Sequence, residues 1–193
     1  MRFCVAPKVL YAINALRCCS LQQGGHMNKN PRGFSLIELL IVVAVILVIA
    51  AIAIPNLMRS RAAANQASAV GSLRVMNTAE ATYSSTYGGY TPTLGYLGPP
   101  STGTSPVPSG AELIDSILAG GSAGATESSK SGYTFTYSAG VADTSGRIYA
   151  YTITAGPITP GTTGYNYYYT DQTGVIRQNT TAEAGSTDSP LAG

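Results

Sequence analysis

Arg32-Gly33-Phe34-Ser35-Leu36-Ile37-Glu38 leads directly into an unbroken apolar run from Leu39 to Ile54. A membrane-spanning helix needs about 20 predominantly apolar residues, and residues 34–54 reach that length with a single charged side chain, Glu38. An ionisable side chain inside a membrane costs about 2.5 to 3.5 kcal/mol on insertion scales. We therefore expect the Glu38 carboxylate to have a partner or a function.

The residues before the apolar run complete a recognisable pattern. Lys29 and Arg32 form a short basic segment that keeps this side in the cytoplasm by the positive-inside rule. Together with the glycine, the aromatic residue and the glutamate that follow, residues 27–87 resemble type IV prepilins and the related pseudopilins. In that family a peptidase cuts after the glycine, here Gly33, and methylates the new N-terminus, here Phe34.

The resemblance also implies a set of partners. Glu38 matches the family's key glutamate, so it is expected to act in assembly by pairing with the N-terminal amine at Phe34 of a neighbouring copy. The implied partners are other copies of the chain in a helical polymer, the prepilin peptidase, the assembly machinery of the inner membrane and the membrane itself. The resemblance implies no cofactor.

Two other readings of the motif stay open. In a conventional signal peptide the apolar stretch has about 7 to 15 residues and ends at a small-x-small site, for which Ala51-Ile52-Ala53 would serve. The run is too long for this reading, and Glu38 would lie inside it. Alternatively, Ser35 and Glu38 have the spacing of a capping box, in which each side chain accepts a hydrogen bond from a free backbone N–H at a helix start.

The first 26 residues differ from the rest and contain all three cysteines, Cys4, Cys18 and Cys19. Met27 would begin a leader of the length typical of prepilins, so we expect translation to start there rather than at Met1. Gln23-Gly24-Gly25 would then be a ribosome-binding site read as protein. The alternatives are a long leader or a lipid or metal site at Cys18 and Cys19.

Cleavage after Gly33 would change the charge of the chain. The first 33 residues hold five of the eleven basic residues and none of the nine acidic ones, so the side-chain charge changes from +2 to −3. The remaining basic residues are scattered from Arg59 to Arg177 and form no basic stripe. The composition therefore gives no indication of dedicated nucleic-acid binding.

Catalytic and metal-binding residue types are scarce after Gly33. The only histidine, His26, and all the cysteines precede that position, so Ser-His-Asp, Cys-His and the usual zinc sites cannot form in the mature chain. Glu112 and Asp115 are a conceivable catalytic pair, but a solvated helix face is favoured. Asp143 or Asp171 could bind calcium, as in major pseudopilins, but a plain turn is favoured. We expect no catalytic residue and no metal site.

A second helical segment is predicted after the apolar run. One stripe at helical spacing faces a core, and the other side is polar. Pro55 predicts a kink because it removes an amide donor and clashes with the preceding turn, and Gly88-Gly89 predicts the helix end. The stripe consists of Val70, Leu73, Met76, Glu80, Tyr83 and Tyr87, and the polar side of Ser72, Arg74, Thr78 and Thr82.

Gly, Pro, Ser and Thr dominate after Tyr90 and indicate a connecting loop. A short helix is predicted over 110–119, with Leu113, Ile114, Ile117 and Leu118 buried. Alternation predicts a sheet with Tyr133, Phe135 and Tyr137 on one face and Thr134 and Thr136 on the other, and a hairpin turn at Asp171–Gly174. The predicted strands are 132–138, 147–154, 165–170 and 175–178.

These patterns predict an α+β fold: a long N-terminal helix packed on a small antiparallel sheet of three to four strands. The expected segments are 1–26 (mis-start or extended leader), 27–33 (leader), 34–54 (membrane and polymerisation helix), 55–89 (amphipathic helix), 90–130 (loop with short helix), 131–179 (sheet) and 180–193 (flexible tail).

The expected function is a structural, non-enzymatic subunit of a type IV pilus for adhesion or motility. It would be made in the inner membrane with a single span and then moved to an extracellular pilus. Two alternatives stay open: a pseudopilin of a type II secretion system in a periplasmic pseudopilus, and a membrane-tethered binding domain that never polymerises.

Overall fold

The computed structural model describes residues 33–100, 103 and 105–191. The elements are helix α1 (Leu36–Tyr87), the 3-10 helix η1 (Leu94–Leu97) and five strands: β1 (Glu127–Lys130), β2 (Tyr133–Ala139), β3 (Tyr151–Pro157), β4 (Tyr167–Asp171) and β5 (Arg177–Asn179). The chain divides into one unit up to Val42 and a second from Val43 onward. The cysteines, His26 and the expected start at Met27 lie outside the described residues.

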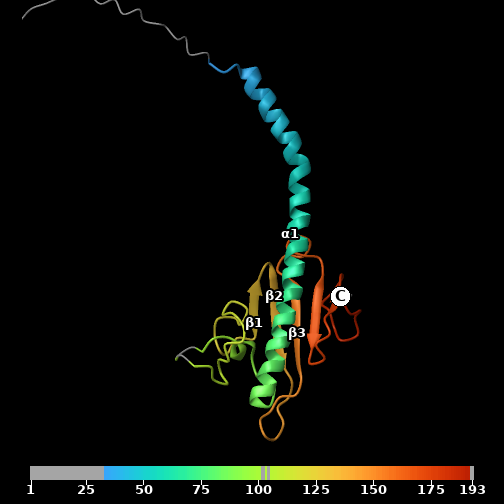
Figure 1. The fold of residues 1–193 in the computed structure, drawn as a ribbon. Coiled ribbons are helices and arrows are strands. Elements are labelled where there is room, and N and C mark those ends of the chain that lie inside the picture. The colour runs from blue at the N-terminus through green and yellow to red at the C-terminus, as the bar shows by residue number, and fades with distance from the viewer. Residues whose placement is uncertain (1–32, 101–102, 104, 192–193) are drawn as a thin grey trace, which may run out of the picture. The chain divides into compact units, whose positions relative to one another are not determined.

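The part of α1 that follows the apolar run packs on the sheet through the predicted stripe (Figure 1). Leu73, Met76 and Glu80 are fully buried, and Val70 and Tyr83 nearly so. The polar side is exposed as predicted at Arg74, Thr78 and Thr82, but Ser72 is buried. The prediction for Ser72 is wrong because Ser72 directly precedes Leu73 in a wide buried face, and a small side chain fits there.

The amphipathic segment of α1 has a proline at its start and a glycine with positive φ at its end. Gly88 has φ +80°, its N–H donates to the carbonyl of Ser84, and α1 ends at Tyr87 as predicted. Such a left-handed glycine is a common helix stop because it has no Cβ to clash. Pro55 lies inside α1 without ending it, and a kink there stays a prediction.

The sheet is an antiparallel meander in which sequential strands are neighbours, in the order β1-β2-β3-β4-β5. Tyr137 pairs with Ile153, and Ile153 pairs with Thr170. Residues on β2 alternate as predicted: Tyr133, Phe135 and Tyr137 are buried, and the intervening threonines are half-buried. One face of the sheet therefore forms the core with α1.

The fifth strand, β1, was not predicted, so the expected three to four strands are one too few. Its sequence, Glu-Ser-Ser-Lys, lacks β-branched and aromatic residues. It forms because Ser131 and Gly132 both have positive φ, which closes a two-residue hairpin onto β2. Polar residues suit an edge strand, because they discourage pairing with other chains.

The bounds of two other strands differ from the prediction. β3 begins at Tyr151 rather than at Arg147, because residues 147–150 close a loop in which Ile148 bridges Ala142 and the Arg147 carbonyl accepts the Asp143 N–H. β5 covers Arg177–Asn179 rather than 175–178. The turn between β4 and β5 is as predicted, with Gly174 at φ +74° and its N–H donated to the Asp171 carbonyl.

The predicted helix over 110–119 is wrong. The N–H groups of Ala111, Glu112, Leu113 and Ile114 donate to carbonyls of residues 96–98 instead of forming a helical ladder, and Glu112 has φ +54°. Ile114 and Leu118 are buried and Leu113 half-buried, but Ile117 is 64% exposed. The short helix in this region is instead η1, whose Leu94 and Leu97 are fully buried.

The C-terminal segment contacts the sheet edge, contrary to the expected frayed tail. Over residues 180–191 the Leu191 N–H donates to the Ile176 carbonyl, and the Gln178 N–H donates to the Ser189 carbonyl. Ala184 is buried. These contacts cover the outer edge of β5, which composition alone does not reveal.

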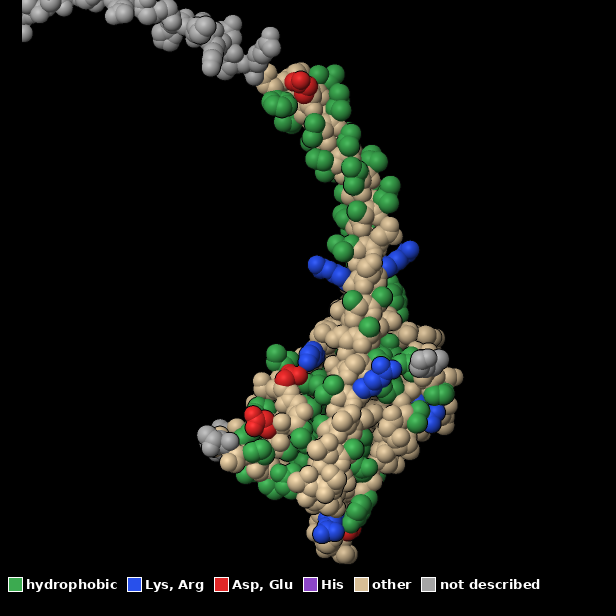
Figure 2. Space-filling model, viewed as in Figure 1, with side chains coloured by type: hydrophobic (Ala, Val, Ile, Leu, Met, Phe, Trp, Pro, Cys, Tyr) green, Lys and Arg blue, Asp and Glu red, His purple; other side chains and the backbone are tan. Residues whose placement is uncertain are grey.

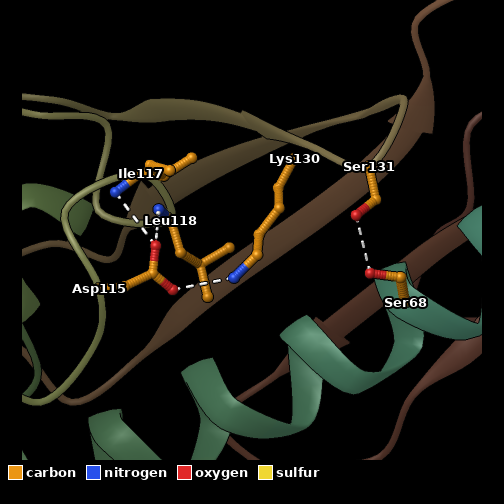
Figure 3. A network of polar contacts seen from close by, with 6 residues as sticks. All are labelled: Ser68, Asp115, Ile117, Leu118, Lys130 and Ser131. Carbon is orange, nitrogen blue, oxygen red and sulfur yellow. Dashed lines mark hydrogen bonds and ion pairs between the residues drawn. The ribbon is translucent and has the colours of Figure 1, made fainter.

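Polar side chains tie α1 to the sheet and its loops at several levels. The Asn65 amide donates to the Thr163 carbonyl at 2.9 Å, and the Ser68 hydroxyl donates to that of Ser131 at 2.9 Å (Figure 3). Further along, the Asn77 amide donates to the Thr170 hydroxyl at 2.8 Å. The helix is therefore fixed in register on the sheet as well as packed against it.

Candidate cleavage and assembly site

The start of α1 carries the residues of the predicted processing motif. The helix begins at Leu36, so Ser35 occupies the N-cap position. The backbone N–H of Ser35 donates to Glu38 Oε2 at 2.9 Å, and the Leu39 N–H donates to the Ser35 carbonyl at 3.2 Å. A glutamate in this position satisfies a free N–H and interacts favourably with the positive end of the helix dipole.

This contact is one half of the capping box that the sequence allowed. The glutamate side chain accepts the N-cap amide, which is the part of the capping alternative that the structure confirms. Both groups are exposed. The Glu38 carboxylate can therefore accept a further donor, and capping does not compete with a contact to another molecule.

Gly33 and Phe34 are not held by the rest of the described chain. Phe34 is 82% exposed, and a Cβ added to Gly33 would meet no atom within 4 Å. The fold therefore imposes no requirement for glycine at this position. A requirement for glycine would have to come from a molecule that acts on the segment.

The apolar part of α1 is exposed along its whole length. Its most apolar window has no buried residue, and the helix is long and apolar enough to cross a membrane by length and composition. Figure 2 shows hydrophobic side chains along the exposed surface of this part of the helix. The exposed large residues are Leu36, Ile37, Leu39, Leu40, Ile41, Val42, Val43, Val45, Ile46, Leu47, Val48, Ile49, Ile52, Ile54, Leu57 and Met58.

Glu80 is a carboxylate in the core whose role sequence reasoning missed. The Thr91 N–H donates to Glu80 Oε2 at 3.1 Å and the Thr91 hydroxyl donates to Oε1, while the Tyr137 hydroxyl donates to the Thr91 carbonyl. Burial raises the pKa of Glu80, and the bonds from Thr91 partly oppose the shift. The sequence feature that could have indicated this role is an acidic residue on the otherwise apolar stripe. Its position favours a structural tie between α1 and the following loop.

The partners of the Asp115 carboxylate are Ile117, Leu118 and Lys130 (Figure 3). It therefore does not act with Glu112 as a catalytic pair. Asp115 Oδ1 accepts the N–H groups of Ile117 and Leu118, and Oδ2 forms an ion pair with Lys130 Nζ at 2.9 Å. The hydrogen bond from Lys130 lowers the pKa of Asp115. Asp115 therefore stabilises a turn and its contact with β1.

The two aspartates considered for calcium each close their own turn. Asp143 Oδ1 accepts the N–H groups of Ser145 and Arg147, and the hydroxyl of Ser145 lowers the pKa of Asp143. Asp171 Oδ1 accepts the N–H of Thr173 at 2.9 Å. Across the described residues, no three His, Cys, Asp or Glu side chains gather in a group that could hold a metal ion.

Comparison with known proteins identifies the N-terminal segment. Residues 28–54 match the prokaryotic N-terminal methylation motif. The chain is 46% identical over 56 residues to the type IV major pilin protein PilA of Myxococcus xanthus, covering 29% of this chain and 26% of that protein. It is 57% identical over 37 residues to the type IV wide pilus major component PilA4 of Thermus thermophilus, covering 19% of this chain and 28% of that protein.

The similarity is confined to part of each protein. The matched region spans about a quarter of the length of these two relatives, and no solved structure gives a significant match. The match includes the glycine, the aromatic residue, the glutamate and the apolar helix of the predicted site. In this N-terminal segment, the chain is similar to type IV major pilins and carries the prokaryotic N-terminal methylation motif.

Proposed function

We propose that the chain is a structural subunit of a type IV pilus, made as a membrane-anchored precursor and polymerised through the apolar part of α1. The observation that carries the proposal is an exposed apolar helix behind a methylation motif. Its surface needs a membrane or other helices around it, because exposing apolar surface to water costs about 25 cal/mol per Å².

The first step is removal of the leader. Prepilin peptidase would cut between Gly33 and Phe34 and methylate the new amine. Phe34 is exposed, and a Cβ added at Gly33 would meet no atom of the described residues within 4 Å, so an enzyme can reach the bond without unfolding α1. The leader carries Lys29 and Arg32, and its removal lets the N-terminus leave the cytoplasmic face.

The second step is assembly. The Glu38 carboxylate would pair with the N-terminal amine at Phe34 of an adjacent copy, while the apolar helices pack together. Removing one member of a buried ion pair typically costs about 3 to 5 kcal/mol, enough to select one register. Repetition of one heterologous contact gives an open helical polymer.

Both matched relatives are named as major pilus components, which favours a surface pilus over a pseudopilus. Shearing cells and probing the released material with an antibody to the globular part tests the proposal. Abundant sheared protein, and loss of surface filaments by electron microscopy when the gene is deleted, is the expected result. Protein confined to the membrane, with unchanged filaments in the deletion strain, would contradict it.

A further inference from the structure

Two arginines mark the point where the exposed apolar surface of α1 ends. Met58 is the last large exposed apolar residue of the run, and Ala62 is the first buried residue of the helix. Arg59 and Arg61 lie in the three-residue interval between them, and both are exposed. The globular part therefore begins directly after this basic interval.

The two side chains leave the helix in nearly opposite directions. Residues two apart on an α-helix are separated by about 200° around its axis. Figure 2 shows basic side chains on both sides of the helix where the hydrophobic surface ends. The one ion pair among the described residues joins Lys130 and Asp115, so Arg59 and Arg61 have no carboxylate partner there.

The two loops that hydrogen-bond to α1 just beyond this interval carry no acidic residue. Asn65, one turn beyond Arg61, hydrogen-bonds to the loop residue Thr163, and Ser68 hydrogen-bonds to Ser131 in the β1–β2 turn. The residues of these loops, 131–132 and 159–164, are all uncharged. The two guanidinium groups therefore form a local positive site on a mature chain that is negative overall.

The position of the site along the chain matches the depth of a lipid headgroup layer. Counted from Phe34, about 20 residues cross the hydrocarbon core, and the headgroup regions add several Å on each side. At about 1.5 Å per helical residue, that count reaches the level of Arg59 and Arg61. Lys29 and Arg32 flank the opposite end of the span.

We propose that Arg59 and Arg61 bind the phosphate groups of anionic phospholipids at the outer surface of the inner membrane. The inference rests on the proposed membrane-anchored precursor. A headgroup layer surrounds the helix on all sides and can satisfy two oppositely directed guanidinium groups at once, whereas a single acidic patch on a neighbouring copy can meet only one. The contact fixes the depth of the span and is given up when the subunit joins a filament.

Lipid selectivity beside the two arginines can be measured directly. The chain has no tryptophan, so Leu57→Trp places a single indole one turn from Arg61, on its face of the helix. The full chain is reconstituted in vesicles of phosphatidylglycerol and phosphatidylcholine, with either lipid brominated in turn. The ratio of indole quenching by the two brominated lipids gives the local enrichment of the anionic lipid.

We expect phosphatidylglycerol to be enriched, by up to about fivefold for each arginine, because each basic residue at an anionic surface contributes roughly that factor. Arg59→Gln with Arg61→Gln should bring the ratio close to one, and so should high salt. Arg74→Gln, an exposed arginine farther along α1, should leave it unchanged. Lys29→Gln with Arg32→Gln should also leave it unchanged, because those residues lie at the other end of the span.

Equal quenching by the two lipids in the parent chain would overturn the proposal. So would enrichment that survives the double arginine substitution, because groups other than Arg59 and Arg61 would then hold the anionic lipid. A variant that fails to insert shows no quenching by either lipid. In that case Arg59→Gln and Arg61→Gln are measured one at a time, and each should lower the enrichment. The measurement needs no filament, so a chain that forms pili without lipid enrichment would sink this inference alone.

Discussion

Glu80 and Thr91 are joined inside the core, where the Thr91 N–H and hydroxyl donate to the two carboxylate oxygens of Glu80. Thr91 follows the helix end and begins the connecting loop, and both residues are fully buried. The contact therefore fixes where the chain goes after α1. It also places one titratable group where burial disfavours its charge.

The first prediction concerns this carboxyl. Because its folded pKa is raised above the ordinary value of 4.5, its contribution to stability is fully present below that value and is lost as pH rises through the folded pKa. Glu80→Gln removes this dependence. From pH 4 to pH 8 the free energy of unfolding of the variant should improve relative to the parent, measured by urea denaturation. Glu183→Gln, at an exposed position, is the control, and a parallel pH dependence in parent and Glu80→Gln would contradict the prediction.

A second prediction concerns independent folding. Among the residues that the structure describes, every buried apolar one lies at or beyond Ala62, and no cysteine follows Cys19 in the sequence. A fragment starting at Asn56 should fold alone, and reducing agent should leave its thermal unfolding unchanged. A marked fall in melting temperature on reduction would disprove this.

Processing gives the third prediction. Mature protein should begin at N-methylated Phe34, and Gly33→Val should accumulate as uncleaved precursor, because the branched side chain would crowd a site that accepts glycine. The substitution should not perturb the fold, since a Cβ at Gly33 meets nothing within 4 Å. Mass spectrometry of the N-terminus decides, and a start at Ile54 would instead establish the signal-peptide reading.

The fourth prediction separates the two roles of Glu38. Glu38→Gln keeps an oxygen that can accept the Ser35 N–H but removes the charge. If capping is the whole role, filaments should be normal; if the carboxylate pairs with the amine at Phe34, they should be few. We expect few filaments by electron microscopy at normal membrane levels of the subunit. Glu38→Ala should insert into the membrane at least as well as the parent chain and form no more filaments than Glu38→Gln. Filament numbers equal to those of the parent in Glu38→Gln would rule out charge pairing.

A fifth prediction compares two glycines in the Asn56 fragment. At Gly164 an added Cβ would lie 2.1 Å from the Tyr133 hydroxyl, which donates to the Asn166 carbonyl. Gly164→Ala should therefore destabilise by about 1 to 3 kcal/mol through overpacking. At the exposed helix position Gly71 an added Cβ meets nothing, so Gly71→Ala should stabilise by about 0.5 to 1 kcal/mol. Urea denaturation tests both, and equal effects would refute the comparison.

Sequence predicted those features that depend on regular spacing. The stripe from Val70 to Tyr87 and the alternation of Tyr133, Phe135 and Tyr137 follow from one helical and one strand period. The end of α1 at Gly88 and the turn at Gly174 followed from glycine, because both positions need positive φ. Local chemistry decided each of these features.

Tertiary contacts decided the features that sequence missed. Residues 111–114 have helix-compatible side chains, but their N–H groups bond to carbonyls of residues 96–98. β1 is polar and exists because its hairpin joins it to β2; the Ser131-Gly132 pair was the only local signal. In the candidate site, spacing indicated the contact between Ser35 and Glu38, whereas the assembly contacts involve other molecules and stay predictions.

The polar ties along α1 have a mechanical consequence. Asn65, Ser68, Asn77 and Glu80 each hold the helix to a different loop or strand, so it cannot slide or roll on the sheet without breaking several bonds in parallel. A pulling force applied to the helix would be shared among these anchors rather than peeling them one at a time. In a filament built from such subunits, the helices would carry the tension, and each sheet would move with its helix as a rigid block.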